Sequence, residues 1–443
     1  MGLAGQERRV CEAIEARRNE LVALASTLIA FDTTARMPGD PPREEAQLQE
    51  YLAERLRDAD ARIDLFEPDS LVLQGKPLIP PGLDFVGRPQ LIARKRGGGS
   101  GPSLLLNGHI DVVSPEPREA WTSPPFAPEV RDGNLYGRGA CDMKGGIAAM
   151  VLAVETLGAL GFELAGDVVI ATNTDEESSG AGGMALVQRG LRTDAGIVCE
   201  PTGFDTWVAC RGSEYGVVHI PGRPGHAEVY QPEWRRGGAV NAIEKSVVVL
   251  EAIASLRREW STRKGLEHSL LARPALLATM ARSGEWHVTY PASAELTIAV
   301  MYLPAQADER GWGTEVRGEV EQWIARETAA ADDWLSAHPP HIDWWPNGVM
   351  PFELAQSEPI IATMLDAARD VAHPGRVGGL DSWYDGATLT QLAGIPSIAF
   401  GPPGFDAEGV SVAHMVDEHV PVDGLIGCAQ AIAVAAMRFC GLA

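Results

Sequence analysis

Short apolar runs alternate with longer amphipathic stretches over the first half of the chain. The runs are bounded by glycine and polar residues and are too short for helices, so they predict buried strands. We expect strands at residues 104–106, 161–172 and 195–198, and helices at residues 7–30, 44–58 and 143–157. Strands that alternate with helices in this way are typical of an α/β domain with a mainly parallel sheet.

The pattern changes after residue 210. The next expected elements are a strand at 214–221, a helix at 240–260, strands at 275–283 and 294–303, a helix at 309–327 and a strand at 341–345. This β-α-β-β-α-β order is that of the split ferredoxin-like unit. A helix at 359–371, a strand at 395–400 and a helix at 425–439 follow. We therefore predict an α/β domain of residues 1–212 and 349–443, interrupted by a ferredoxin-like α+β domain at residues 213–348.

The composition is that of an ordinary globular protein: of 443 residues, 45% are hydrophobic and 22% charged. The 37 lysines and arginines are outnumbered by 60 aspartates and glutamates, which gives a formal net charge of −23. Polyanions repel so acidic a chain, which argues against nucleic acid or a membrane as partner. The first twenty residues are charged, unlike a secretory signal, and no run of about eighteen apolar residues appears.

The cysteines are scattered along the chain, with no close pair of the Cys-x-x-Cys kind. They are Cys11, Cys141, Cys199, Cys210, Cys428 and Cys440. In a chain of this size, such scattering favours reduced thiols over a disulfide framework. We therefore expect a cytoplasmic protein.

Candidate chemistry begins at the end of the strand at 104–106. His109 follows the Asn107-Gly108 break and should lie at the carboxyl end of that strand. Asp111 is placed to accept the second ring N–H of His109, which would leave one ring nitrogen free for a metal. Asp142 precedes the helix at 143–157 in a glycine-rich turn, where its carboxylate could bridge two cations.

Further carboxylates and imidazoles follow other apolar runs. Glu176 and Glu177 follow the strand that ends at residue 172, Glu200 follows the strand at 195–198, and His414 lies near the C-terminus. Ligands of open α/β sheets collect at the carboxyl ends of the strands. Carboxylates and imidazoles without cysteine pairs suit zinc or a related divalent ion in a catalytic site. The alternative is a set of solvated acidic loops, which would rarely produce this pattern.

Six motifs now stand in order along the chain: NGHIDVV, GRGACDMKGG, TDEESSGAGG, CEPTG, PGRPGHA with a later NAI, and GPPG followed by AHMVDEHV. Together they resemble the successive motifs of the co-catalytic zinc amidohydrolase and metallopeptidase family. That family includes acetylornithine deacetylase, succinyl-diaminopimelate desuccinylase, aminoacylase and glutamate carboxypeptidase. The resemblance covers nearly the whole chain.

The resemblance implies two divalent ions per chain, zinc first, with cobalt or manganese as alternatives. It implies these metal ligands: His109 and Glu200 on one ion, Glu177 and His414 on the other, and Asp142 bridging both. Glu176 resembles the general base, which takes a proton from the water that bridges the metals. Asp111 is the accompanying catalytic-site carboxylate beside His109.

The same resemblance implies a role for the inserted domain. In the family this insert covers the active site of the catalytic α/β domain and pairs two subunits, which implies a homodimer. His226, in PGRPGHA, resembles the lid histidine that reaches the oxyanion in the partner's active site. Asn241, in NAI, resembles the lid asparagine near the substrate.

Two positions depart from many relatives. Met301 stands where a lid arginine often precedes Leu-Pro, and Ala387 follows Asp385-Gly386 where a second arginine is frequent. Because arginine grips a carboxylate bidentately, these departures argue against acetylornithine or succinyl-diaminopimelate as the substrate.

We therefore predict a metal-dependent amidohydrolase that deacylates a small N-acyl amino acid or related compound. A dipeptidase or carboxypeptidase, or a hydrolase of an aromatic amide or amine, is the alternative. A catalytically idle metal-binding dimer is a remote third reading, and the intact Glu176 argues against it.

Overall fold

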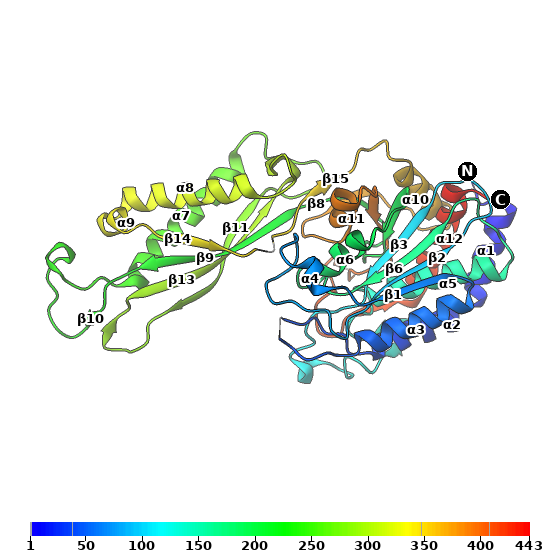
Figure 1. Cartoon of the computed structure of the whole chain (residues 1–443), viewed down its shortest axis with the longest axis horizontal. Coiled ribbons are helices and arrows are strands. Elements are labelled where there is room, and N and C mark those ends of the chain that lie inside the picture. The colour runs from blue at the N-terminus through cyan, green and yellow to red at the C-terminus, as the bar shows by residue number, and fades with distance from the viewer. Residues whose placement is uncertain (1, 38, 347, 407) are drawn as a thin grey trace. The chain divides into compact units, whose positions relative to one another are not determined.

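The computed structural model describes residues 2–37, 39–346, 348–406 and 408–443 and contains two compact units (Figure 1). Unit 1 comprises Met1–Ala209, Glu353–Gly379 and Tyr384–Ala443. Unit 2 comprises Cys210–Phe352 and Leu380–Trp383.

A large mixed sheet forms the centre of unit 1, with its strands in the order β1-β2-β6-β3-β7-β17-β8-β15, and with β16 paired to β8. The strands are β1 (Arg62–Phe66), β2 (Gln90–Lys95), β3 (Leu104–His109), β6 (Val168–Asn173), β7 (Ala195–Val198), β8 (Thr206–Cys210), β15 (Phe352–Glu353), β16 (Val377–Leu380) and β17 (Ser397–Ala399). The central strands β6, β3, β7 and β17 are parallel, whereas β1, β2 and β8 join antiparallel. Every residue of β3, β6 and β7 is buried, so both faces of the sheet are covered.

Helices supply that cover. They are α1 (Gly5–Ala16), α2 (Arg18–Ala30), α3 (Glu45–Asp58), α4 (Ser70–Leu73), α5 (Lys144–Ala159), α6 (Ala181–Arg189), α10 (Pro359–Asp370), α11 (Gly386–Ala393) and α12 (Val422–Cys440). α5 and α12 pack on each other and on β3, while α6 and α11 pack on each other and on β6 and β7. A small antiparallel sheet joins β4 (Glu129–Arg131), β5 (Asn134–Tyr136) and β18 (His419–Pro421).

α12 is long and apolar enough to cross a membrane by length and composition alone. However, 78% of its apolar window is buried inside the structure, where the helix packs against α5, α10 and α1. Its composition is therefore that of a core helix.

Three predicted elements differ from the structure. The helix expected at 309–327 begins only at Thr314 and ends at Ala331. The helix expected at 7–30 is divided at Arg17 into α1 and α2, and both of these helices pack on α5 and α12. The strand expected at 161–172 begins only at Val168. The backbone N–H groups of Ala165 and Gly166 donate to the carbonyls of Gly441 and Cys440 near the chain end, so this segment is not part of the sheet.

Unit 2 has the expected β-α-β-β-α-β order. Its elements are β9 (Gly212–Pro221), β10 (Gly225–His226), α7 (Ala242–Thr262), β11 (Ala275–Ser283), β12 (Thr289–Tyr290), β13 (Ser293–Tyr302), α8 (Thr314–Ala331), α9 (Asp333–Ala337) and β14 (His341–Trp344). The antiparallel sheet runs β11-β13-β9-β14, and β10 pairs with β12. α7 and α8 cover one face of this sheet around a core that includes Val218, Leu256, Trp260, Ile298 and Val320. The predicted fold class, a mainly parallel α/β domain with an inserted α+β unit, is confirmed.

Candidate metal centre and active site

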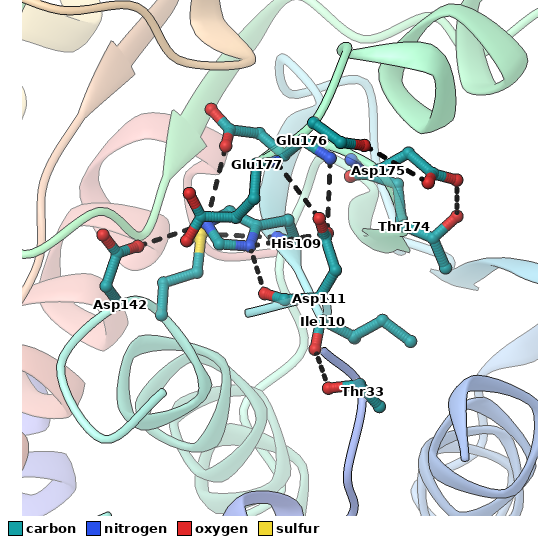
Figure 2. A network of polar contacts seen from close by, with 12 residues as sticks. Thr33, His109, Ile110, Asp111, Asp142, Thr174, Asp175, Glu176 and Glu177 are labelled. Carbon is teal, nitrogen blue, oxygen red and sulfur yellow. Dashed lines mark hydrogen bonds and ion pairs between the residues drawn. The ribbon is translucent and has the colours of Figure 1, made fainter. Parts of the chain in front are cut away.

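Parallel register brings the predicted ligands to one edge of the sheet in unit 1. His109 at the end of β3 is level with Asn173 at the end of β6, and Asn107 is level with Val198 at the end of β7. Because these strands are parallel, the loops that follow them leave at the same edge. Those loops carry Glu176, Glu177 and Glu200; Figure 2 shows the two glutamates of the β6 loop beside His109.

Asp142 lies between two imidazoles. Its Oδ1 is 3.2 Å from Nε2 of His109, and its Oδ2 is 3.4 Å from Nε2 of His414. Glu200 approaches the first imidazole, with Oε1 3.9 Å from Nε2 of His109. Glu177 approaches the second, with Oε2 3.1 Å from Nε2 of His414. The structure therefore gathers two groups, each with one imidazole and one glutamate, around a shared aspartate.

The donors of this cluster suit divalent cations. Imidazole nitrogens and carboxylate oxygens are the donors that catalytic zinc sites use, and a carboxylate can bridge two ions. Ligand atoms of His109, Asp142 and Glu177 all lie within 4.8 Å of one another. Oε1 of Glu200 is buried and, in the described part of the chain, has no hydrogen-bond partner. A cation would satisfy this otherwise costly buried oxygen.

The carboxyl groups of the site are crowded and buried. Burial raises the pKa of Glu176 well above its usual value, and the charges of Glu200 and Glu177 act in the same direction. Burial likewise raises the pKa of Glu200, with the charge of Asp142 adding to the effect. The site thus holds more acidic groups than its two imidazoles can neutralise, which favours bound cations.

The same crowding shifts the pKa values of the two imidazoles. Burial would lower the pKa of His109, but its hydrogen bond to Asp142 and the charge of Glu176 outweigh burial and raise this pKa well above the usual value. Hydrogen bonds to Asp142 and Glu177 raise the pKa of His414 to about 10. Burial would raise the pKa of Asp142, yet the two imidazoles hold it below its usual value.

Asp111 is not placed as we expected. Nδ1 of His109 lies 2.8 Å from the backbone carbonyl of Asp111, while the carboxylate is 3.6 Å away. That carboxylate instead accepts hydrogen bonds from the backbone N–H groups of Glu176, at 3.3 Å, and Glu177, at 3.1 Å (Figure 2). The turn that carries Glu176 and Glu177 occupies both carboxylate oxygens of Asp111. The backbone carbonyl of Asp111, and not its carboxylate, therefore orients the ring of His109. Burial raises the pKa of Asp111 to about 8.

Glu418 and Arg138 were not predicted as site residues from the sequence. Oε1 of Glu418 accepts from the backbone N–H groups of Cys141 and Asp142, at 3.0 and 3.1 Å. Its Oε2 accepts from Nη1 of Arg138 at 2.6 Å, and both side chains are buried. This pair fixes the loop that presents Asp142. Both residues lie inside quoted motifs, AHMVDEHV and GRGACDMKGG, which was the signal that could have identified them.

A second missed group lies behind the ligands. Asn107 donates to Oδ1 of Asn173 at 2.9 Å, and Asn173 donates to Oδ2 of Asp385 at 2.6 Å. Burial raises the pKa of Asp385 to about 6, although the hydrogen bond from Asn173 opposes the shift. This chain links the ends of β3 and β6 to the start of α11.

His226 and Asn241 belong to unit 2. His226 is exposed on β10, opposite Thr289 of β12, and its Nδ1 accepts from the backbone N–H of Glu228 at 3.2 Å. Asn241 caps α7, since its Oδ1 accepts from the backbone N–H of Ile243 at 3.0 Å. Their roles toward the substrate stay predictions.

A cluster of carboxylates and imidazoles at the carboxyl ends of parallel strands is typical of a metal-dependent enzyme. The sequence profile of peptidase family M20/M25/M40 matches residues 105–438, and the chain belongs to this family. The membership inferred from the six motifs is therefore confirmed.

Three comparisons illustrate the likeness. The chain is 26% identical to N-formyl-4-amino-5-aminomethyl-2-methylpyrimidine deformylase of Halalkalibacterium halodurans, over 97% of this chain and 96% of that protein. It is 30% identical to succinyl-diaminopimelate desuccinylase of Alkalilimnicola ehrlichii, over 91% of this chain and 94% of that protein. The structure of human carnosine dipeptidase 1 aligns with a TM-score of 0.72 at 15% identity, covering 99% of this chain and all of that one. The first two relatives, a deformylase and a desuccinylase, remove acyl groups, which agrees with the predicted deacylase function.

Proposed function

We propose that this protein is a dinuclear amidohydrolase that removes a short acyl group from the nitrogen of a small molecule. The observation that carries the proposal is the position of Asp142 between two groups of one imidazole and one glutamate each. His109 and Glu200 would hold one divalent ion, Glu177 and His414 would hold the other, and the carboxylate of Asp142, which faces both imidazoles, would be shared between them. Zinc suits these donors first, with cobalt or manganese as alternatives.

Ions bound there would polarise the scissile carbonyl and lower the pKa of a water. Glu176 is the general base. Its Oε2 is 4.0 Å from Nε2 of His109, the ring nitrogen that also faces Asp142, so its carboxylate borders the same space as the ligands. Glu176 takes a proton from the attacking water on its carboxylate and delivers it to the leaving amine.

Asp111 and Glu418 position the segments that carry the proposed ligands and the general base. Asp111 binds the turn that carries Glu176 and Glu177, whereas Glu418 binds the backbone of Asp142. Both are buried acceptors of backbone N–H groups, so they act as positioning residues.

Metal removal is the first test. We expect elemental analysis to find up to two divalent ions per chain, and we expect dialysis against a chelator to abolish hydrolysis. Zinc, cobalt or manganese should restore it, because the five donors rebind the ion. A metal-free protein that retained full activity would contradict the dinuclear proposal.

The acyl group is proposed from two observations. The deformylase relative aligns over almost the whole chain. In addition, Met301 is half-buried on β13 and Ala387 is buried in the first turn of α11, and neither side chain can bind a substrate carboxylate. A formyl or acetyl group needs no such partner, whereas a succinyl group does. The relative at 30% identity keeps desuccinylation as the second candidate.

The choice between a formyl or acetyl group and a succinyl group is tested with a matched panel of substrates. The panel contains N-formyl, N-acetyl, N-carbamoyl and N-succinyl derivatives of the same amines, together with dipeptides and aromatic amides. We expect kcat/KM for the best formyl or acetyl substrate to exceed that of its succinyl counterpart by about tenfold or more, because a hydrogen bond to a charged group contributes about 1.5–3 kcal/mol. A preference for succinyl substrates would instead support desuccinylation, and a preference for dipeptides the peptidase alternative.

We also propose a homodimer formed through unit 2. Ile243, Val247 and Leu250 are 48%, 63% and 40% exposed and stand at i, i+4 and i+7 on α7, which makes one apolar stripe. α7 packs on β11, an edge strand that exposes Leu277 and Met280. An apolar helix stripe beside an open strand edge is typical of a surface that pairs with a second copy.

The cysteines support a proposed cytoplasmic location. All six cysteines are buried thiols. Reduced cysteines are typical of the cytoplasm, where we place the protein.

A further inference from the structure

A second group of metal-binding side chains lies in unit 2, on the face of the sheet that α7 and α8 do not cover. His219 and His341 are direct partners across β9 and β14, and Asp343 follows two residues along β14. Val218 and Ile220 of β9 point into the helix-covered core. Because side chains alternate along a strand, His219 points to the open face.

The distances within this group are short. Nε2 of His219 lies 3.1 Å from Oδ2 of Asp343, and the rings of His219 and His341 are stacked with centroids 4.7 Å apart. One ligand atom from each of the three residues can be chosen so that all lie within 4.8 Å of one another. Metal–nitrogen bonds of about 2.1 Å keep two ligand atoms within about 4.2 Å, so small rotations of these side chains would complete a site.

Glu295 provides an outer partner. It lies opposite His219 on the third strand, β13, with Oε1 3.5 Å from Nδ1 of the ring. A carboxylate that accepts the second ring N–H orients an imidazole for metal binding through its other nitrogen. Here that other nitrogen is the one that faces Asp343.

We propose that His219, His341 and Asp343 form a separate divalent-metal site on the open face of the unit 2 sheet. Two imidazoles and one carboxylate select zinc, nickel, copper or cobalt rather than magnesium or calcium, which prefer oxygen donors. The remaining coordination position is open to water. A bound ion joins the edge strand β14 to β9, and so stabilises the edge of the sheet opposite β11. The proposal uses residues of unit 2 alone and does not depend on the proposed function.

Metal counting tests the site directly. The purified enzyme is dialysed against buffered zinc and the ions per chain are measured for wild type, His341→Ala and Asp343→Asn. We expect each variant to bind one ion fewer than wild type, because each loses one of three ligands. His287→Ala, which removes another exposed histidine of unit 2, is the matched control and should bind as many ions as wild type. All four proteins share the same active-site ligands, so the difference is independent of the number of ions held there.

A second measurement does not depend on total stoichiometry. Zinc should slow amide hydrogen exchange along β14 in wild type and in His287→Ala, but not in Asp343→Asn, which preserves the shape of the side chain. Glu295→Gln should weaken zinc binding by about 10–100-fold. If His341→Ala and Asp343→Asn bind as much zinc as wild type and with the same affinity, the site does not exist. If Glu295→Gln alone leaves the affinity unchanged, Glu295 does not orient His219.

Discussion

Glu176→Gln is expected to lower kcat by about 10²–10⁴-fold while the metal content stays close to that of wild type. Glutamine preserves the size of the side chain but cannot take a proton from water at neutral pH. The proposed ligands do not include Glu176, and its backbone N–H, which Asp111 binds, is unchanged by the substitution. Steady-state kinetics and elemental analysis of the same preparation measure both quantities.

The neighbouring residue provides the matched control. Glu177→Gln removes a proposed ligand that contacts His414, so this variant should lose or weaken one metal site as well as activity. The two substitutions are chemically identical and one residue apart, so their contrast separates proton transfer from metal binding. If Glu176→Gln loses metal and Glu177→Gln retains it, the two roles are reversed.

His226→Ala is expected to lower kcat/KM by about 10²–10³-fold with both metal ions retained, as does the loss of one oxyanion donor in other enzymes. The imidazole is exposed on β10 of unit 2, remote in sequence from every proposed ligand. We propose that it stabilises the oxyanion in the active site of the partner subunit.

Mixing two inactive variants tests this arrangement. A dimer of one His226→Ala chain and one Glu176→Gln chain has one site that lacks both residues and one site that has both. Such heterodimers should therefore show about half of the wild-type activity per dimer. Each variant incubated alone is the control for residual activity, and mass spectrometry measures heterodimer formation. Heterodimers that form without recovering activity would show that His226 does not act across the interface.

The local pattern of the chain was sufficient to place the long helices and the central strands, but it did not predict β1, β2, β8, β15 or β16 of the large sheet. Apolar runs predicted β3 and β7, and the change of pattern near residue 210 predicted the β-α-β-β-α-β order of unit 2. Strand ends also indicated where His109 and Glu200 would meet, because parallel strands deliver their carboxyl ends to one edge. These inferences depend on interactions within a segment or between neighbouring strands, which periodicity reports well.

Contacts between distant segments were beyond the reach of such patterns. The ion pair of Arg138 with Glu418 joins residues 280 positions apart, and nothing local in either segment requires it. The division of the predicted N-terminal helix at Arg17 was likewise not visible in the hydrophobic pattern. The role of Asp111 was misjudged because its spacing from His109 suggested a partner, whereas the folded β6 loop supplied two better donors.

By itself, the sequence determined which carboxylates and imidazoles are available for a site, and it determined the fold class. Both follow from residue type and hydrophobic period, which are local properties of the chain. The tertiary structure alone decided that Asp142 lies between His109 and His414, and that His219 faces Asp343 on an open sheet. Those distances depend on how loops and strands from separate parts of the chain pack together, since only packing converts a set of residue types into a site of defined geometry.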